Sequence, residues 1–488
     1  MVTSGRLPKE LALLRAKVAS SILRVLRIEG SSMIKITKFG GSSVSSAGQF
    51  KKVKAIVQAD PSRRFVVVSA AGKRDKFDSK ITDLLYLVNA HLQYHVTCDD
   101  LLGTIGQRFC EIAKELNLSY PISQEFGIFR ELAKRGEYTP EYIVSRGEYF
   151  TGRMMAEYLG FPFVDAADVI TFRPDSSIDM DKTAEKLKAA IGEEKCFVLP
   201  GFYGATEDGK IKLLDRGGGD ITGAIVAQCL GADLYENWTD VSGFLTADPR
   251  IVDNPKSISR ITYAELRELS YMGASVLHEE AIFPVKDAGI PLVIKNTNAP
   301  DDPGTVISEE TEPGVAEPLI TGIAGKKDFI AIHVKTNHMS SKVGYIRKTL
   351  SIFERYRVSI EHIPTGIDSF AVVVQGGDVK DCLYSIVADI KSELEPDEIK
   401  IVDRLALIST VGRNMPSRPG TSGRLFGELG HAGINIRMIA QGSEELDIVV
   451  GVDVDDFERA IRVIYGAFVD GDDNIITVEE AEEEATNE

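Results

Sequence analysis

The chain has 488 residues, which is too long for one compact core and predicts two to four domains. Hydrophobic residues make up 43% and charged residues 26%, the balance of a soluble globular protein. No apolar run reaches the roughly 18 residues that a membrane-spanning helix needs. The formal net charge of −17 argues against nucleic-acid binding, which depends on clustered Lys and Arg. An anionic substrate must therefore be attracted by basic groups close to its site.

The five cysteines favour neither a disulfide framework nor a zinc site. Their number is odd, they are scattered along the chain, and no two of them form a C-x-x-C pair. We therefore expect a protein of the reducing cytoplasm, with no metal site of its own.

The two ends of the chain differ in composition from the rest. Residues 1–32 combine helical spacing of apolar residues with several basic residues, but they lack the apolar core and cleavage site of a secretory signal. We interpret them as a non-catalytic N-terminal extension, or as an upstream start ahead of a natural Met33, with a targeting presequence as the alternative. Residues 476–488 form an acidic run that is typical of a solvated tail.

From Met33 onward, short apolar runs alternate with amphipathic stretches. Strands are expected at 34–38, 65–69, 163–165, 196–199 and 292–295. Helices are expected from about residue 47 and at 81–94, 145–159, 182–191, 220–230 and 263–287. This alternation predicts an α/β fold with a mostly parallel sheet sandwiched by helices, and ligands beyond the carboxyl ends of its strands. We assign residues 33–310 to this domain, because a polar, proline-rich boundary runs from 298 to 318.

Beyond that boundary the chain repeats itself. Residues 329–374 align with 405–450 without a gap at a constant offset of 76 residues, which places Met339 on Met415 and Gly344 on Gly420. Both copies read strand, loop, amphipathic helix, strand, turn, strand, and a helix closes each one. The pattern predicts two small βαββαβ modules, at 319–400 and 401–475.

The segment Lys38-Phe-Gly-Gly-Ser-Ser-Val44 directly follows the first expected strand. Two glycines let backbone amides approach a ligand closely, and together with the start of the next helix they form an anion site that Lys38 can also reach. The spacing differs from the G-x-x-x-x-G-K-[ST] of P-loop proteins. Taken alone, a Gly-Gly segment of this kind is more often a simple turn.

A second glycine-rich segment, 214–224, leads into a helix. Arg216 and Asp220 flank three consecutive glycines with opposite charges. This arrangement suits an amino acid, since a guanidinium binds a carboxylate and an aspartate can hold an ammonium. The alternative is a helix capped by Asp220 with flexible glycines before it.

Three further segments carry weaker signals. The loop 237–251 contains the only tryptophan and several polar groups, which fits nucleotide contacts or a packed surface loop. Glu148, in Ser145-Arg-Gly-Glu148, has the position of a helix-dipole partner. His278-Glu-Glu lacks the second histidine of a zincin.

Together and in this order, the motifs resemble those of the aspartate kinases of the amino acid kinase family. The matching segments are Lys38–Val44, Ser145–Glu148, Arg216–Asp220, 238–241, 246–250 and 273–278. The similarity spans about residues 33–470, and the two repeats look like the ACT domains with which these enzymes sense the end products of their pathway.

The resemblance implies phosphoryl transfer from ATP to L-aspartate, with Mg²⁺ riding on the nucleotide phosphates. Lys38 and Asp220 are the implied catalytic residues. Implied ATP contacts are Lys38, Gly40, Gly41, Ser42, Ser43, Thr239, Asp240, Asp248, Arg250 and Ser275. Implied aspartate contacts are Ser69, Thr82, Glu148, Arg216 and Asp220. An ionised carboxylate acceptor needs no general base, so catalysis reduces to positioning and electrostatic stabilisation.

The resemblance also implies feedback regulation by an amino-acid effector, lysine and/or threonine, bound at an ACT–ACT interface of a homodimer. The implied effector positions are Met339, Ser340, Val343, Gly344, Glu361, Asn435, Ile436, Gln441 and Ser443. Neither nucleic acid nor a membrane is an expected partner.

The sequence departs from the common pattern of these kinases at three positions. Ser275 stands where many relatives have lysine, Gly219 replaces a frequent serine, and Asp215 adds a negative charge beside Arg216. These departures bear on nucleotide affinity and leave two alternatives open: a kinase acting on another amino acid such as glutamate, and a ligand-sensing regulatory subunit with impaired catalysis.

Overall fold

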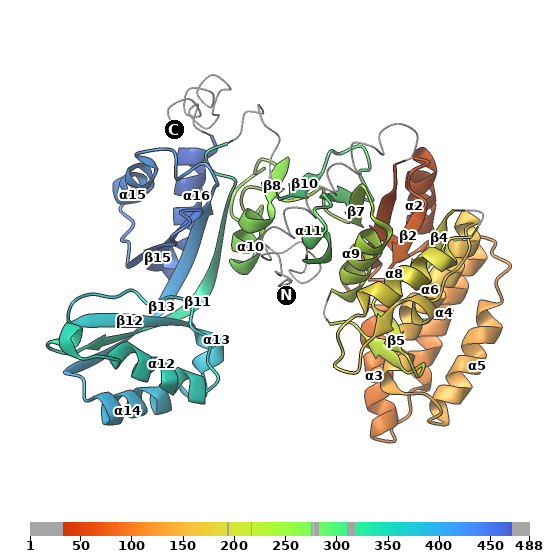
Figure 1. Ribbon diagram of the computed structural model, residues 1–488, viewed down its shortest axis with the longest axis horizontal. Coiled ribbons are helices and arrows are strands. Elements are labelled where there is room, and N and C mark those ends of the chain that lie inside the picture. The colour runs from red at the N-terminus through yellow and green to blue at the C-terminus, as the bar shows by residue number, and fades with distance from the viewer. Residues whose placement is uncertain are drawn as a thin grey trace, which may run out of the picture.

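The computed structural model describes residues 33–192, 195–215, 217–274, 277, 283–309 and 318–470. The predicted extension 1–32 and the acidic tail 476–488 lie outside these residues. Figure 1 shows two lobes, an α/β lobe formed by the first part of the chain and a second lobe formed by the last part. Within the described residues, no helix has the length and apolar character required to cross a membrane.

The first lobe is built on a seven-stranded sheet with the strand order β4-β2-β1-β7-β9-β10-β8. Its strands are β1 (Lys35–Phe39), β2 (Phe65–Val68), β4 (Phe197–Pro200), β7 (Leu234–Thr239), β8 (Arg260–Thr262), β9 (Leu292–Asn296) and β10 (Thr305–Ser308). Every pairing is parallel except that of β10 with β9. The predicted mostly parallel sheet is therefore confirmed. The expected strand at 163–165 is wrong, because Phe163 forms only an isolated bridge with Val198.

Helices cover both faces of this sheet. They are α2 (Ala47–Ala59), α3 (Ile81–Gln93), α4 (Asp99–Glu115), α5 (Ile122–Lys134), α6 (Pro140–Leu159), α7 (Ala166–Val169), α8 (Met180–Ala190), α9 (Gly218–Leu230), α10 (Tyr263–Tyr271) and α11 (Phe283–Asp287). Because side chains alternate along a strand, Val66 and Val68 pack in the core under α2–α6, whereas Phe65 and Val67 pack in the core on the α7–α9 side. A small sheet of β3 (Thr171–Phe172), β5 (Tyr203–Thr206) and β6 (Ile211–Leu213) lies beside it.

The predicted single helix 263–287 is wrong, because the described residues form the separate helices α10 and α11. Helix α10 ends at Tyr271, and Gly273 follows with a φ of +104°, a conformation that ends a helix and favours glycine.

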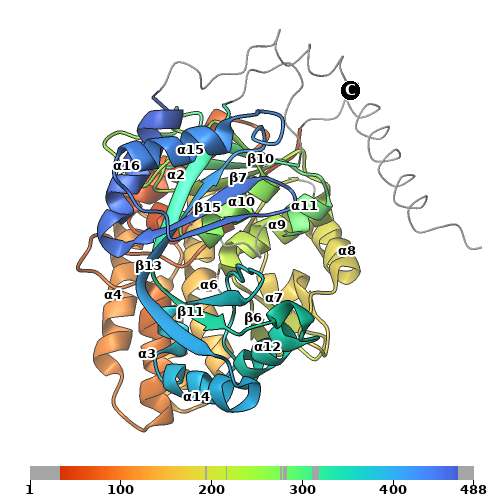
Figure 2. The ribbon, with the colours of Figure 1, turned by 90° about the vertical axis from the view of Figure 1, so that its left-hand side faces the viewer.

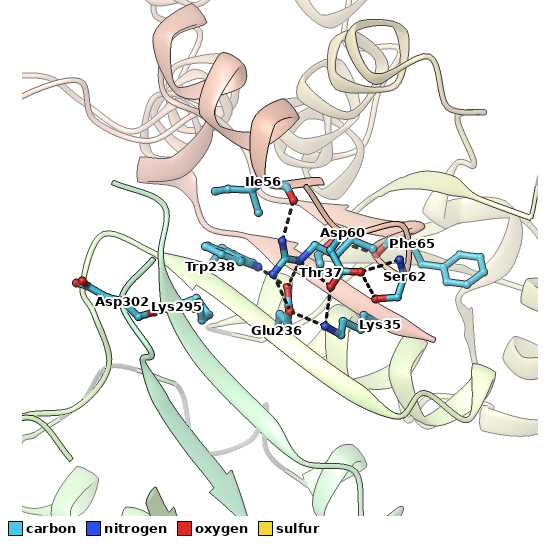
Figure 3. A network of polar contacts seen from close by, with 11 residues as sticks. Lys35, Thr37, Ile56, Asp60, Ser62, Phe65, Glu236, Trp238, Lys295 and Asp302 are labelled. Carbon is cyan, nitrogen blue, oxygen red and sulfur yellow. Dashed lines mark hydrogen bonds and ion pairs between the residues drawn. The ribbon is translucent and has the colours of Figure 1, made fainter. Parts of the chain in front are cut away.

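A buried ion-pair network joins β1 and β7 on the face opposite α9 (Figure 3). The Glu236 carboxylate accepts two hydrogen bonds from Arg63, at 2.8 and 3.2 Å, and one from the Trp238 indole at 2.9 Å. Lys35 lies 3.7 Å from the same carboxylate and also pairs with Asp60 at 2.7 Å. With its carboxylate compensated in this way, the strand can carry a glutamate into the core. The Trp238 indole is a structural anchor in this network.

The second lobe is one antiparallel sheet with the order β12-β11-β13-β15-β14. Its strands are β11 (Gly322–Lys335), β12 (Ser369–Gln375), β13 (Glu398–Val411), β14 (Met438–Gln441) and β15 (Asp447–Asp453). Its helices are α12 (Tyr345–Arg355), α13 (Gly376–Val379), α14 (Leu383–Leu394), α15 (Thr421–His431) and α16 (Phe457–Phe468). In Figures 1 and 2, α15 and α16 lie at one end of the long strands β11 and β13, and α12 and α14 lie at the other.

The two repeats share their longest strands instead of following one another along the chain. Residues 322–326 of β11 pair with 407–411 of β13, and Ile323 packs in the core of the second repeat with Leu425 and Ile461. Residues 331–335 pair with 398–402 and belong to the first repeat. The strand that completes the second module thus comes from upstream, so the expected division at 400/401 separates segments that fold together. Asp328 and Arg404 lie where β11 and β13 pass from one module to the other. They are 76 residues apart, and both have positive φ.

The glycines matched by the repeat have the same conformation. Gly344 and Gly420 precede α12 and α15 with φ of +78° and +94°, values that side-chain-bearing residues rarely adopt. The expected second strand of the first repeat is only partly formed, as isolated bridges at His362 and Thr365. Pro364 lies between them and has no amide hydrogen to donate to a ladder.

A buried carboxylate joins the two lobes. Glu265 of α10 completes a capping box with Thr262, and its Oε1 atom accepts from Thr321 at 2.5 Å. Arg413 donates to the same carboxylate through its backbone amide at 3.1 Å and its guanidinium at 2.6 Å. The Glu265 side chain is completely buried. One side chain therefore caps a helix of the first lobe and holds two segments of the second.

Replacing Glu265 by Ala is expected to lower the free energy of unfolding by about 3–5 kcal/mol, because it removes a cap and leaves buried donors without their acceptor. Urea unfolding followed by circular dichroism measures the change. The control is Glu185→Ala on the exposed surface of α8, for which we expect a change within about 0.5 kcal/mol. Equal stability of the two variants would contradict the role of Glu265.

Candidate active site

A cavity of about 1420 Å³ opens at the carboxyl ends of strands β1, β2 and β7. Ten of the residues proposed from sequence line it: Lys38, Gly40, Gly41, Ser42, Ser69, Thr82, Glu148, Asp220, Thr239 and Asp240. They come from segments as far apart as the start of the first lobe and the end of β7. The parallel sheet brings these segments to one edge.

At the centre of the cavity wall, Lys38 and Asp220 form an ion pair with a distance of 2.5 Å between Nζ and Oδ1. Lys38 and Asn237 are register partners on β1 and β7, and Asn237 also donates to Asp220 Oδ1, at 2.9 Å. The Lys38 side chain is 8% exposed and that of Asp220 is 17% exposed. A charge pair this enclosed is weakly screened by water, so it responds strongly to any further charge in the cavity.

Asp220 lies in the first turn of α9, and the N-cap position of that helix belongs to Gly217, with a φ of +85°. The alternative that Asp220 caps the helix is therefore wrong. The turn packs tightly, since a Cβ atom on Gly219 would lie 2.8 Å from Ser69 Oγ. The absence of a side chain at Gly219 lets α9 begin against the end of β2.

The first glycine turn is held by backbone contacts on two sides. The Gly40 amide donates to the Trp238 carbonyl at 2.9 Å, and the Gly72 amide donates to the Gly41 carbonyl at 2.8 Å. A Cβ atom on Gly40 would lie 3.4 Å from Lys38 Nζ. The turn and the Lys38 ammonium therefore face the same volume, as an anion-binding turn requires.

Three residues expected to contact ATP lie elsewhere. Ser43 is buried behind the turn, where its hydroxyl is 2.7 Å from Thr297 Oγ1 and 3.4 Å from the Trp238 carbonyl. Asp248 and Arg250 pair with each other at 2.6 Å on the surface and are not among the residues that line the cavity. The spacing of the sequence could not predict that the Ser43 hydroxyl would find its partners inside the protein. Nor could it predict that Asp248 and Arg250 would pair with each other.

Two further residues of the expected site lie outside the described part of the chain. These are Arg216 and Ser275. The neighbours of Arg216, Asp215 and Gly217, both line the cavity.

Glu148 is a buried carboxyl group in the cavity wall. Its side chain accepts a hydrogen bond from the Ala70 amide, and among the described residues its Oε2 atom has no partner. Burial raises its pKa from the usual 4.5 to about 8. Such a group is protonated when the cavity is empty of cations, and an ammonium beside it favours its ionised form.

Sequence reasoning missed several residues that line the cavity. They include Gln49, Lys73, Arg74, Lys80, Asp83, Tyr86, Phe202, Asn237 and Asn298. Lys73 and Arg74 had a usable signal, because they lie in the loop that follows the parallel strand β2, and ligands gather beyond the carboxyl ends of such strands. Phe202 and Tyr86 had none, since aromatic residues after a strand or on a helix usually belong to a core.

The described residues contain no group of three or more His, Cys, Asp and Glu side chains arranged to hold a metal ion. Asp220, which lines the same cavity as the first glycine turn, already pairs with Lys38.

The positions expected to bind an effector lie in both halves of the second lobe. Met339 is buried, Val343 is fully exposed, and Gly344 precedes α12. The side chain of Ser340 lies outside the described part. Asn435, Ile436, Gln441 and Ser443 flank or end β14 in the second repeat. None of these positions lines the cavity of about 370 Å³ that includes His333, Phe370 and Met438.

Glu361 connects the second lobe to the first. Its carboxylate accepts a hydrogen bond of 2.6 Å from the hydroxyl of Tyr271, the last residue of α10. The Lys326 ammonium lies 5.1 Å from the centre of the Tyr271 ring. Tyr271 therefore contacts an expected effector position while ending the helix that precedes Ser275.

The raised pKa of Glu148 predicts a pH dependence of stability. The folded protein holds this proton up to about pH 8, whereas the unfolded chain loses it near pH 4.5, so the group's contribution falls as the pH rises between these values. Glu148→Gln has no such group. We expect the melting temperature of the wild type to fall relative to Glu148→Gln between pH 5 and 8; parallel curves would contradict the assignment.

Comparison with known proteins agrees with this geometry. Residues 33–296 match the model of the amino acid kinase family, and residues 408–468 match the model of an ACT domain. Aspartokinase 3 of Bacillus subtilis (strain 168) is 35% identical to this chain over 452 residues, covering 90% of this chain and 99% of that protein.

Solved structures of similar proteins cover both lobes. Aspartate kinase from Clostridium acetobutylicum superposes with a TM-score of 0.84 at 48% identity, covering 90% of this chain and 100% of that chain. Escherichia coli aspartokinase III is 25% identical; its complex with aspartate and ADP gives a TM-score of 0.67, with 89% and 99% coverage. Its complex with lysine and aspartate gives 0.70, with 90% and 100% coverage.

Proposed function

Since this chain belongs to the amino acid kinase family and is a kinase that phosphorylates aspartate using ATP, we propose that the acceptor is the β-carboxylate of L-aspartate. The γ-phosphoryl group of ATP moves to this carboxylate, giving 4-phospho-L-aspartate and ADP. The observation that carries the proposal is the Lys38–Asp220 pair, which lies between two glycine turns in one cavity.

The turn at Gly40–Ser42 is the proposed phosphate site. The turn and Lys38 line the cavity, and negative charge on the transferring group is stabilised there in the transition state. Thr239 and Asp240, at the end of β7, are the proposed contacts on the nucleotide side. Mg²⁺ binds with the nucleotide and supplies further charge neutralisation when present.

The far side of the cavity is the proposed aspartate site. Glu148 and Asp220 supply negative charge for the substrate ammonium, and Arg216 is the proposed partner of its α-carboxylate. Ser69 and Thr82 line the same cavity, where their hydroxyls can orient the β-carboxylate. Because this carboxylate is ionised at neutral pH, attack on phosphorus requires no base.

Lys38→Ala tests the proposed site directly. Removing the ammonium should lower kcat by about 10²–10³-fold or more, because charge on the phosphoryl group loses its buried partner and Asp220 is left unpaired. Aspartate-dependent ADP release, measured by a coupled assay, gives the rate. Lys188→Ala, on the exposed side of α8, is the control that should keep full activity.

The wild-type assay also separates the alternatives. Turnover with glutamate but not aspartate would replace the proposed substrate. Absence of turnover in both the wild type and Lys38→Ala would indicate a regulatory subunit without catalysis of its own.

We further propose that the second lobe is a regulatory unit of two ACT modules that binds an amino-acid effector and forms a homodimer. Escherichia coli aspartokinase III has been solved with lysine, which makes lysine the first candidate effector and threonine the second. The proposed biological role is the first step of lysine, threonine and methionine biosynthesis in the cytoplasm. Feedback by an end product then requires a mechanical link from the second lobe to the cavity.

The Tyr271–Glu361 hydrogen bond is the proposed link. Tyr271→Phe removes the hydroxyl and keeps the ring, so the rate without effector should change by less than about twofold. The concentration of lysine or threonine that halves the rate should change by about fivefold or more, the scale of a typical coupling energy. Tyr384→Phe, at an exposed position on α14, is the matched control. An unchanged effector response in Tyr271→Phe would exclude this link.

A further inference from the structure

The loop between β2 and α3 is clamped at both ends by one buried arginine. Arg108 of α4 is 3% exposed and donates to two backbone carbonyls, those of Gly72 at 2.5 Å and Ser79 at 2.6 Å. It also lies 3.4 Å from the Asp78 carboxylate. A guanidinium that spans the base of a loop in this way fixes where the loop emerges, while the residues between 73 and 77 remain exposed.

The clamped end lies directly against the proposed phosphate turn. Besides the hydrogen bond from Gly72 to Gly41, a Cβ atom on Gly72 would lie 2.5 Å from the carbonyl carbon of Gly41. The two backbones therefore touch, and no residue other than glycine fits at position 72 without moving one of them. The next residue, Lys73, consequently leaves the loop base beside the turn that faces the phosphate site.

The charges in the cavity require such a cation. Among the described residues, four cationic side chains line it: Lys38, Lys73, Arg74 and Lys80. Lys38 pairs with Asp220, and Arg74 pairs with Asp78 and Glu111. Lys73 and Lys80 form no ion pair within the described residues, and only Lys73 directly follows the Gly72–Gly41 contact. Since six acidic residues line the same cavity, a triphosphate gains from every uncommitted cation.

We propose that Lys73 is a second cation of the phosphoryl-transfer site, and that Arg108 is a positioning residue that holds it there. This inference rests on the proposed function and adds to it a source of positive charge that the sequence motifs did not include. In the reaction, the bond from the γ-phosphorus to the bridging oxygen of ADP breaks, and a bond from phosphorus to an aspartate carboxylate oxygen forms. Lys73 keeps its proton throughout and acts by its charge alone.

The loop offers a matched control in Lys76. Lys76 has the same charge, is also exposed, and lies with its ammonium 4.9 Å from the Phe77 ring centre, but it is not among the residues that line the cavity. Lys73→Ala should lower kcat/KM for ATP by about tenfold, less than the roughly 10²–10³-fold effect of an enclosed donor because Lys73 is exposed. Lys76→Ala should retain the wild-type value. Equal values for the two variants would overturn the proposal.

Binding measurements distinguish this proposal from the proposed function. In calorimetric titrations without aspartate, Lys73→Ala should bind ATP about tenfold more weakly than Lys76→Ala but bind adenosine equally well. If wild type binds ATP without any aspartate-dependent turnover, the proposed function fails, while the ratio of the two ATP affinities still decides the role of Lys73. Equal ATP affinities, or an equal loss for adenosine, would refute it.

The role of Arg108 is tested by a double-mutant cycle. If Arg108 acts through Lys73, Arg108→Lys should lower kcat/KM for ATP, and combining it with Lys73→Ala should add less than about twofold further loss. Arg108→Lys keeps the charge but loses the fork that reaches both carbonyls. Fully additive losses would show that Arg108 only stabilises the fold, and melting temperatures measured in parallel confirm that each variant is folded.

Discussion

The ion pair between Lys38 and Asp220 is the interaction on which the site depends. It connects the end of β1 to the first turn of α9, and Asn237 of β7 completes it from the neighbouring strand. Each glycine turn faces the other across this pair, so a ligand that binds one turn lies close to a ligand at the other. The pair is enclosed by the sheet and by α9, which keeps it responsive to the charges that substrates bring.

Three buried glutamates illustrate how the surroundings assign a role to the same side chain. Glu236 is compensated by Arg63 and the Trp238 indole, and it holds strands together. Glu265 is surrounded by donors from α10 and from the second lobe, and it joins the lobes. Glu148 accepts backbone hydrogen bonds, but its Oε2 atom has no partner within the described residues, and burial raises its pKa. Only Glu148 is left able to gain a partner, which is the property expected of a ligand-binding carboxyl.

The second lobe turns a sequence repeat into a single mechanical unit. β11 and β13 each run through both modules, so the two modules share one sheet. Among the contacts between the lobes, α10 supplies a buried one at Glu265 and a surface one at Tyr271. The buried contact at Glu265 is expected to remain fixed. The Tyr271–Glu361 hydrogen bond lies at the surface, where an effector can make or break it, because an exposed hydrogen bond contributes little net free energy. The regulation proposed above would therefore act through α10.

The sequence by itself determined the class of fold, the repeat with its matched glycines, the resemblance to the aspartate kinases, and ten residues of the cavity. These signals are local: strand periodicity, glycines after a strand, and the order of short motifs along the chain. The tertiary structure alone decided that Ser43 turns away from the cavity, that Asp248 and Arg250 pair with each other, and that residues 322–326 complete the second module. It also placed Lys73 beside the phosphate turn. These placements depend on contacts between segments that are distant in the chain, or on which neighbouring atom hydrogen-bonds to a polar group. The spacing of residues along the sequence predicts neither of these.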